Sequence, residues 1–415
     1  MTDNLRIDGQ RLWDSIMEMG KIGETAGGGS HRLALSDEDK VGRDLFKTWA
    51  EAAGCEVAVD ELGNMFALRP GTNNDLPPIG MGSHLDTQPY GGKFDGVFGV
   101  LSGLEVIRVL NDADVTTTHP LVMVNWTNEE GARFAPAMMA SGVYADHFDK
   151  DWILARVAAD DGTTFGAELE RIGYKGDLTI GDYEFAAFFE PHIEQGPILE
   201  VEEKSVGVVD TAQGFRWYDI TFRGHAAHTG STPMVGRRNA LLGVAKVIQA
   251  VDEIAHKHAP YGRGTVGSQF HVGPGSRNII PETVDFTVDM RHPDADSLAA
   301  MDVALREMCE TVTKEIGLEM DFEQISYTPP TIFDKGCVDA VQAAADLIGA
   351  SNMTITSGAG HDACYVAKRY PTSMIFVPCK DGISHNEAES ATQEDLEAGG
   401  NVLLQAVLKY DAAHS

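Results

Sequence analysis

The residues best suited to chemistry stand in Gly82-Ser83-His84-Leu85-Asp86 and in the glycine-rich run around Asp95. Small and apolar residues precede His84, which predicts a buried strand with His84 and Asp86 on one face at its end. One of these two side chains can then bind a metal ion while the other orients it. The glycines that flank Asp95 free the backbone to bring a third ligand to the same point. This pattern is typical of one half of a two-metal hydrolytic site.

A pair of adjacent carboxylates, Glu129 and Glu130, follows an apolar strand predicted over Leu121–Trp126. Neighbouring residues at a strand end point to opposite sides of the strand. One carboxylate can therefore bind a metal ion while the other acts as a general base. Further along the chain, His192 lies in an apolar frame and His385 lies in a loop flanked by glycine and serine.

The candidate ligands share nitrogen and oxygen donor atoms and lack sulfur. Such a set suits Zn²⁺ first, with Mn²⁺, Ni²⁺ or Co²⁺ as alternatives, rather than a cysteine-bound structural zinc. Five protein ligands are too many for one open catalytic zinc, and they suit two divalent metal ions that share a bridging carboxylate. The set consists of His84, Asp95, Glu130, His192 and His385.

The elements that must position these residues alternate between strand and helix. Helical periodicity over 8–23, 41–53 and 98–110, with strands over 79–83 and 121–126, predicts an α/β catalytic domain whose mostly parallel sheet is flanked by helices. From residue 212 the order β-α-β-β-α-β indicates an inserted ferredoxin-like α+β domain. Because candidate site residues resume only after it, we expect residues 1–211 and 328–415 to form the catalytic domain and 212–327 the inserted domain.

Composition narrows the partners and the compartment. The chain has 415 residues with 32 basic and 63 acidic side chains, a formal net charge of −31 that disfavours nucleic acid and anionic membranes. The first residues lack the pattern of a secretory signal, and no apolar run is long enough to span a bilayer. The five cysteines include no Cys-x-x-Cys pair. We therefore expect reduced thiols in a cytoplasmic protein.

Five motifs, taken in order, closely resemble the amidase/hydantoinase-carbamoylase branch of the M20 metallopeptidase clan. They are Gly82-Ser83-His84-Leu85-Asp86, Gly92-Lys93-Phe94-Asp95-Gly96, Asn128-Glu129-Glu130-Gly131, His192-Ile193-Glu194-Gln195-Gly196 and Ser384-His385-Asn386-Glu387. The resemblance implies a zinc-peptidase-like catalytic domain. It also implies that His84, Asp95 and His192 serve one metal ion and that Asp95, Glu130 and His385 serve the other, so that Asp95 bridges. Asp86 is then the carboxylate that fixes the imidazole of His84, and Glu129 is the general base.

The resemblance also assigns residues to the substrate. Gln195 is expected to contact substrate rather than metal, and Gly360 lies in a loop at the pocket. The inserted domain is implied to be a lid and a homodimer surface, in which His228, Asn278 and Arg291 bind substrate. Arg291 suits a substrate carboxylate because its guanidinium can donate two parallel hydrogen bonds. His228 can donate a hydrogen bond to the oxyanion, from the same or the neighbouring subunit.

The reaction implied is hydrolysis of the linear ureido amide of an N-carbamoyl amino acid, or of N-carbamoyl-β-alanine as in a β-ureidopropionase. A metal-bridging water attacks, and the products are the amino acid, ammonia and carbon dioxide. Allantoate amidohydrolase shares every ligand position and remains the nearest alternative. An M20 aminoacylase or dipeptidase is disfavoured by His192-Ile193-Glu194-Gln195. A catalytically inactive binding or regulatory scaffold is a further alternative, which predicts loss of the base or of a ligand.

Overall fold

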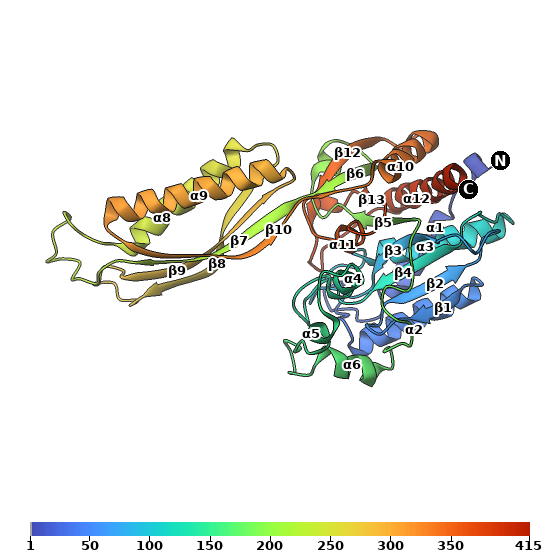
Figure 1. Ribbon diagram of the computed structural model, residues 1–415, viewed down its shortest axis with the longest axis horizontal. Coiled ribbons are helices and arrows are strands. Elements are labelled where there is room, and N and C mark those ends of the chain that lie inside the picture. Colours follow the sequence, from blue (N-terminus) through green and yellow to red (C-terminus); the bar gives the residue numbers. More distant parts are fainter. Residues whose placement is uncertain (1) are drawn as a thin grey trace. The chain divides into compact units, whose positions relative to one another are not determined.

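The computed structural model describes residues 2–415, apart from the side chain of residue 268. The chain divides into two compact units. The first contains the residues up to Asp210 together with Ile332–Ser415, and the second is the continuous segment Thr211–Thr331. Figure 1 shows the course of the chain through both.

The larger sheet has parallel strands at its centre and antiparallel strands toward its edges. Its order is β1-β2-β4-β3-β5-β13-β6-β11, and β12 pairs with β6. The pairs β4-β3, β3-β5 and β5-β13 are parallel, whereas β1-β2, β2-β4 and β13-β6 are antiparallel. The strands are β1 (Glu56–Val59), β2 (Met65–Arg69), β3 (Ile79–His84), β4 (Leu121–Trp126), β5 (Ala187–Ile193), β6 (Val206–Ala212), β11 (Thr331–Ile332), β12 (Asn352–Ser357) and β13 (Thr372–Val377).

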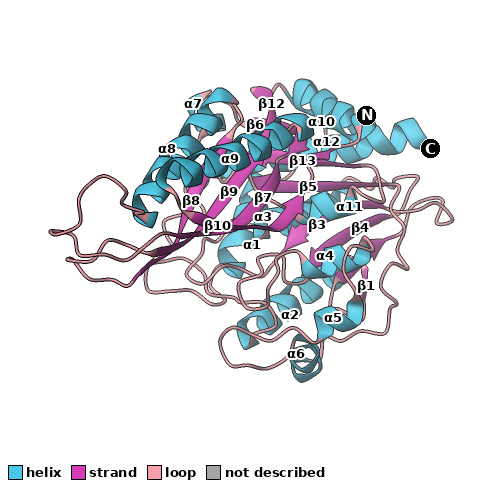
Figure 2. Cartoon of the chain, turned by 60° about the vertical axis from the view of Figure 1, so that its left-hand side comes forward, coloured by secondary structure: helices cyan, strands magenta, loops and turns pink. Residues whose placement is uncertain are grey.

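Helices cover both faces of this sheet (Figure 2). Helices α1, α3, α10 and α12 pack with the large apolar core of one face, and α4 and α11 lie against the aromatic core of the other, around Trp126 and Tyr144. The helices of the first unit are α1 (Gly9–Met19), α2 (Asp37–Ala52), α3 (Val97–Asp112), α4 (Met139–Tyr144), α5 (Lys150–Leu154), α6 (Phe165–Ile172), α7 (Ile198–Val201), α10 (Lys335–Ile348), α11 (Asp362–Val366) and α12 (Gln393–His414). Short 3-10 turns, η1 (Thr2–Asn4) and η2 (Lys380–Gly382), complete it.

Local sequence signals explain where the elements around the site begin. The Ser36 hydroxyl accepts a hydrogen bond from the backbone N–H of Asp39, so α2 starts four residues before its first periodic apolar residue, Val41. Helix α3 is buried along most of its length, in keeping with its nearly continuous apolar sequence. Strands β3, β4 and β5 are buried at every position, as parallel strands covered on both faces must be.

The second unit is a four-stranded antiparallel sheet with two helices, in the order β7-α8-β8-β9-α9-β10. The strand order in the sheet is β10-β7-β9-β8, and α8 and α9 pack together on one face (Figures 1 and 2). The bounds are β7 (Gly214–Arg223), α8 (Ala240–Lys257), β8 (Arg263–Gly273), β9 (Thr283–His292), α9 (Ala295–Ile316) and β10 (Glu319–Thr328).

Two expectations about the whole chain can be compared with these elements. Among the described residues, no helix has both the length and the apolar composition that crossing a bilayer requires. All five cysteines are free thiols, and four of them are buried. Burial raises the pKa of the Cys309 thiol to about 12, which keeps this residue in its unreactive neutral form.

Candidate metal centre and active site

Asp95 lies at the centre of the cluster, two residues before the first residue of α3. Its Oδ1 lies 3.4 Å from the Nε2 of His84 and 3.1 Å from the Nε2 of His192. Its Oδ2 lies 3.6 Å from the Nε2 of His385, which is in turn 3.4 Å from an Oε atom of Glu130. Two groups of possible ligands therefore share one carboxylate, with one oxygen facing each group. The five candidate ligands come together.

The two buried imidazoles are held so that Nε2 faces Asp95. The Nδ1 of His84 lies 2.9 Å from the backbone carbonyl of Asp86, and the Nδ1 of His192 lies 2.9 Å from the carbonyl of Ile193. A carbonyl can only accept, so each Nδ1 carries the proton and each Nε2 presents a lone pair. Gly96 makes room for this arrangement, because a Cβ there would lie 2.4 Å from the ring of His84.

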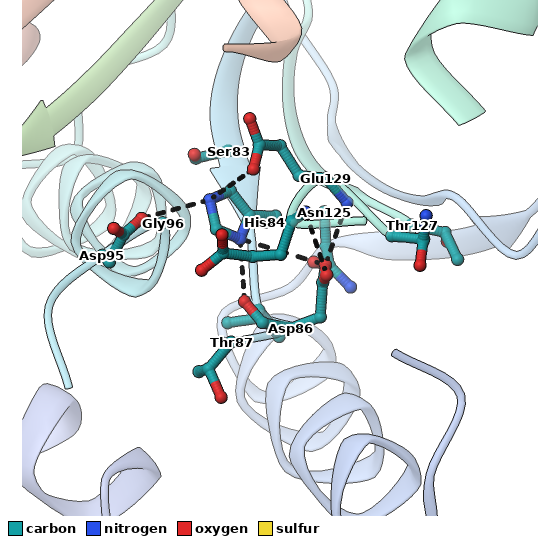
Figure 3. A network of polar contacts seen from close by, with 12 residues as sticks. Ser83, His84, Asp86, Thr87, Asp95, Gly96, Asn125, Thr127 and Glu129 are labelled. Atoms are coloured by element: carbon teal, nitrogen blue, oxygen red, sulfur yellow. Dashed lines mark hydrogen bonds and ion pairs between the residues drawn. The ribbon is translucent and has the colours of Figure 1, made fainter. Parts of the chain in front are cut away.

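The Asp86 carboxylate, which the sequence predicts to fix the imidazole of His84, lies near that ring without being its hydrogen-bond partner. Its Oδ1 is 3.9 Å from the Nδ1 of His84, whereas the main-chain carbonyl of the same residue makes the 2.9 Å contact. The carboxylate accepts instead from the backbone N–H groups of Glu129 and Glu130, each at 3.3 Å (Figure 3). Asp86 thus orients His84 through its backbone. Its side chain positions the turn that carries the two glutamates.

Glu129 and Glu130 face different groups, as expected of adjacent residues at a strand end. An Oε atom of Glu129 lies 3.6 Å from the Nε2 of His84 (Figure 3). The Glu130 carboxylate lies beside His385 and accepts hydrogen bonds from the backbone N–H and the side chain of Gln88, at 3.1 and 2.8 Å. Asn128, just before the pair, has a φ of 59° that turns the chain sharply after β4.

Negative charge accumulates here without enough positive charge to balance it. Burial raises the pKa of the Glu129 carboxyl well above its ordinary value against the opposing effect of His84, and the nearby carboxylates of Asp362, Glu130 and Asp95 raise it further. Burial and Asp95 likewise raise the pKa of Glu130. A bound cation would offset the repulsion among these buried carboxylates and stabilise their charged forms.

The residues present fit a divalent metal ion. The Nε2 of His84 is buried and has no hydrogen-bond partner among the described residues. Its lone pair points into a cluster of carboxylate oxygens, which is the arrangement expected of a metal ligand. The donors are imidazole nitrogens and carboxylate oxygens, as zinc and similar first-row ions prefer.

The family described as peptidase family M20/M25/M40 matches residues 80–409. The chain belongs to this family. Within it, a crystal structure of an amidase of the hydantoinase/carbamoylase family from Burkholderia multivorans is similar with a TM-score of 0.94 and 57% identity, covering 98% of both chains. This M20 protein thus falls in the hydantoinase/carbamoylase branch.

Two curated relatives of the M20 protein bear on its chemistry. An N-carbamoyl-L-amino-acid amidohydrolase from Rhizobium meliloti is 49% identical over 407 residues, which cover 98% of this chain and 97% of that protein. A ureidoglycolate hydrolase from Arabidopsis thaliana is 30% identical over 421 residues, covering 99% of this chain and 88% of that protein.

Two of the expected substrate residues of the M20 protein lie beside the cluster of candidate ligands. The side-chain amide of Gln195 donates to the Oδ2 of Asp95 at 2.8 Å, and its Oε1 is buried with no partner among the described residues. Gly360 precedes His361, whose ring packs against that of His192 with centroids 4.5 Å apart. Both positions can therefore reach a substrate bound at the cluster.

The other expected substrate residues lie in the second unit, at two places. His228 and Asn278 are neighbours, because residue 228 pairs with Ile279 in a β-bridge and the N–H of Thr229 donates to the carbonyl of Asn278. The Nδ1 of His228 accepts two backbone N–H groups, so its proton is on Nε2, free to be donated. Arg291 lies near the other end of β9 and is paired with Asp289 at 2.8 Å.

Sequence reasoning missed Glu389, a buried carboxylate that ties two ligand loops together. Its Oε1 accepts from the backbone N–H groups of Phe94 and Asp95, at 3.0 and 3.1 Å, and its Oε2 accepts from the hydroxyl of Ser384 at 3.1 Å. Burial, with the nearby Asp95, raises the pKa of Glu389 to about 7. The acidic loop contains both Glu387 and Glu389, and nothing in its pattern distinguishes the one that turns inward.

Proposed function

We propose that this M20 protein hydrolyses the linear amide bond of N-carbamoyl-L-amino acids, using two divalent metal ions. The proposal rests on the position of the Asp95 carboxylate between two groups of ligands. One of its oxygens faces His84 and His192, and the other faces His385, which lies beside Glu130. Likeness over nearly the whole length to an N-carbamoyl-L-amino-acid amidohydrolase supports the choice of substrate class.

The residues around the centre suit the proton transfers that this hydrolysis requires. Bound divalent ions supply Lewis acidity toward the ureido carbonyl and toward water. Glu129 has an elevated pKa and lies beside the cluster without being needed in either ligand group, so it can take the proton of the attacking water. The same carboxyl then gives that proton to the departing ammonia. The carbamate that remains decomposes to carbon dioxide and the amino acid.

Polar groups from both units suit the ureido group and its oxyanion. The unpartnered Oε1 of Gln195 is a hydrogen-bond acceptor suited to a ureido N–H. The Nε2–H of His228 is a donor suited to the oxyanion that forms at the carbonyl. Arg291 would exchange Asp289 for the α-carboxylate of the substrate.

The second unit cannot supply all of these groups to one small substrate from a single copy. His228 and Asn278 stand beyond the Thr283 end of β9, and Arg291 lies eight residues further along that strand. At about 3.3 Å per residue the strand alone separates them by about 26 Å. We therefore infer that the protein acts as a homodimer in which one copy contributes Arg291 and its partner contributes His228 and Asn278. The second unit would serve as both the lid and the dimer surface.

The experiment that tests the proposal is ammonia release by metal-free protein restored separately with zinc, manganese, nickel or cobalt. The substrates are N-carbamoyl-L-amino acids and their D enantiomers, N-carbamoyl-β-alanine, allantoate, ureidoglycolate and an N-acetyl amino acid. We expect turnover of the L enantiomers, with zinc as the first candidate ion. Turnover confined to allantoate or to ureidoglycolate would replace the substrate assignment, and no ammonia from any ureido acid would refute the reaction.

A further inference from the structure

Strands β3 and β5 separate before they reach the two histidines that face Asp95. They pair from Ile79 with Ala187 to Met81 with Phe189. Beyond this point, in the part of the chain that the structure describes, β3 pairs only with β4 and β5 only with β13. The main-chain ladder thus ends three residues before His84 and three before His192. Backbone hydrogen bonds between these two strands do not set the separation of the two imidazoles.

The carboxylate of Glu190 bridges this gap. Glu190 is fully buried on β5, two residues before His192. Its Oε1 accepts a hydrogen bond from the hydroxyl of Ser83 at 2.6 Å, and Ser83 directly precedes His84 on β3. A single side chain therefore joins the strand of one histidine to the strand of the other, at the point where the ladder has ended.

The second oxygen of the same carboxylate holds the loop that carries Gly360. The Oε2 of Glu190 accepts from the backbone N–H of Ala363 at 2.7 Å, in the short helix α11. This helix follows His361, whose Nε2 lies 3.0 Å from the hydroxyl of Ser357. Glu190 is thus linked to both strands and to the segment 360–363.

Glu190, His192 and His361 also satisfy the geometric criterion for a cation site, because their ligand atoms lie within 4.8 Å of one another. The geometry favours support over ligation. The two oxygens of Glu190 hold two protein segments, one at Ser83 and one at Ala363. The Nε2 of His192 is directed at Asp95, the carboxylate of the first ligand group, and its Nδ1 bonds to a carbonyl, so this imidazole has no second lone pair for a third ion.

We propose that Glu190 is a positioning residue, whose carboxylate sets the separation of His84 and His192 and thereby the affinity of the group formed by His84, Asp95 and His192 for its ion. The inference rests on the two-ion centre proposed above. Groups that hold metal ligands in place without touching the metal typically change its affinity by about 10- to 100-fold when removed. Glu190 acts on two ligands at once, through the strands that carry them.

The test is cobalt binding to metal-free protein, followed by the visible absorption of the bound ion. His385→Ala removes a ligand from the other group, so in that background the titration reads the His84-Asp95-His192 group alone. There we expect Glu190→Ala to weaken binding by about 10- to 100-fold and to alter the absorption band. Ser83→Ala, which removes only the bridge to β3, should weaken it less.

Two further variants make the result specific. Glu190→Gln should restore most of the affinity, because an amide can accept from Ala363 and donate to the Ser83 hydroxyl. Ser373→Ala is the matched control. Ser373 is a buried serine on β13, opposite Phe189, whose hydroxyl donates to the carbonyl of Val209 at 3.3 Å, and its loss should leave cobalt binding unchanged.

The outcomes separate this inference from the proposed function. Unchanged affinity in both Glu190→Ala and Ser83→Ala, or equal weakening in Ser373→Ala, would overturn the positioning role. Glu190→Gln as weak as Glu190→Ala would do the same. If Glu190→Ala does not fold, Ser83→Ala decides, because it deletes one hydroxyl only. A wild-type protein that binds fewer than two cobalt ions would instead refute the two-ion centre itself.

Discussion

Several residues of the centre have partners that fix which atom they offer. Backbone carbonyls hold the protons of His84 and His192 on Nδ1, so both Nε2 atoms face the same oxygen of Asp95. Glu129 and Glu130 share one turn, held by the Asp86 carboxylate, yet contact different imidazoles. Adjacent residues of identical type can therefore have different roles, and substitution can separate them.

Glu129→Gln should abolish ammonia release while the metal content stays at the wild-type level. The amide keeps the size of the side chain but cannot accept the proton of water, and loss of a general base typically costs about 10²- to 10⁴-fold in rate. Glu130→Gln is the matched comparison, and we expect it to lower the metal content. Metal analysis together with kcat checks both. Loss of metal in Glu129→Gln would show that Glu129 is a ligand.

At the scale of elements, the site forms where strands end and where α3 begins. A mostly apolar run predicts β4 with both of its ends, and the small and apolar residues before His84 predict β3, which ends at His84, so that Asp86 lies beyond the strand. Other features could not be predicted. The loss of pairing between β3 and β5 depends on neighbours that are more than a hundred residues away. The periodicity of one sequence does not show which residues of two distant strands pair with each other. The contact between the backbone carbonyl of Asp86 and His84 could not be predicted either, because every residue has such a carbonyl and the sequence does not show which one faces the ring.

Gly96 shows how an element boundary shapes the centre. Its φ is 67°, and a Cβ would meet the ring of His84 at 2.4 Å. We expect Gly96→Ala to reduce metal affinity as well as stability, because the ring must move away from Asp95. Gly173→Ala is the matched control, since its φ is 76° with nothing within 4 Å, and it should carry only the backbone cost of about 1–2 kcal/mol. Equal metal affinity in both variants would contradict this reading of Gly96.

At the scale of the whole molecule, one unit contains the complete metal-binding cluster and the other contains three of the expected substrate residues. The motifs in the sequence identified these residues, but only the strand register showed that His228 and Asn278 stand at the opposite end of β9 from Arg291. A site that draws on both ends needs two copies of the chain. This requirement can be tested by mixing inactive subunits.

Complementation between His228→Ala and Arg291→Ala subunits should restore activity. In a mixed dimer one site would receive both intact residues and the other neither. Random exchange at equal amounts makes half of the dimers mixed, so about a quarter of the wild-type rate should return. Each variant mixed with itself is the control. If no activity returns after subunit exchange has been verified, both residues act within one chain.

The central claim is a two-ion centre bridged by Asp95, and metal titration of the metal-free protein tests it most directly. We predict two zinc ions per wild-type chain, about one in His192→Ala and one in His385→Ala, and loss of both high-affinity sites in Asp95→Asn. Isothermal titration calorimetry with elemental analysis provides the count. A single ion per wild-type chain, or an Asp95→Asn variant that still binds two ions tightly, would contradict the account.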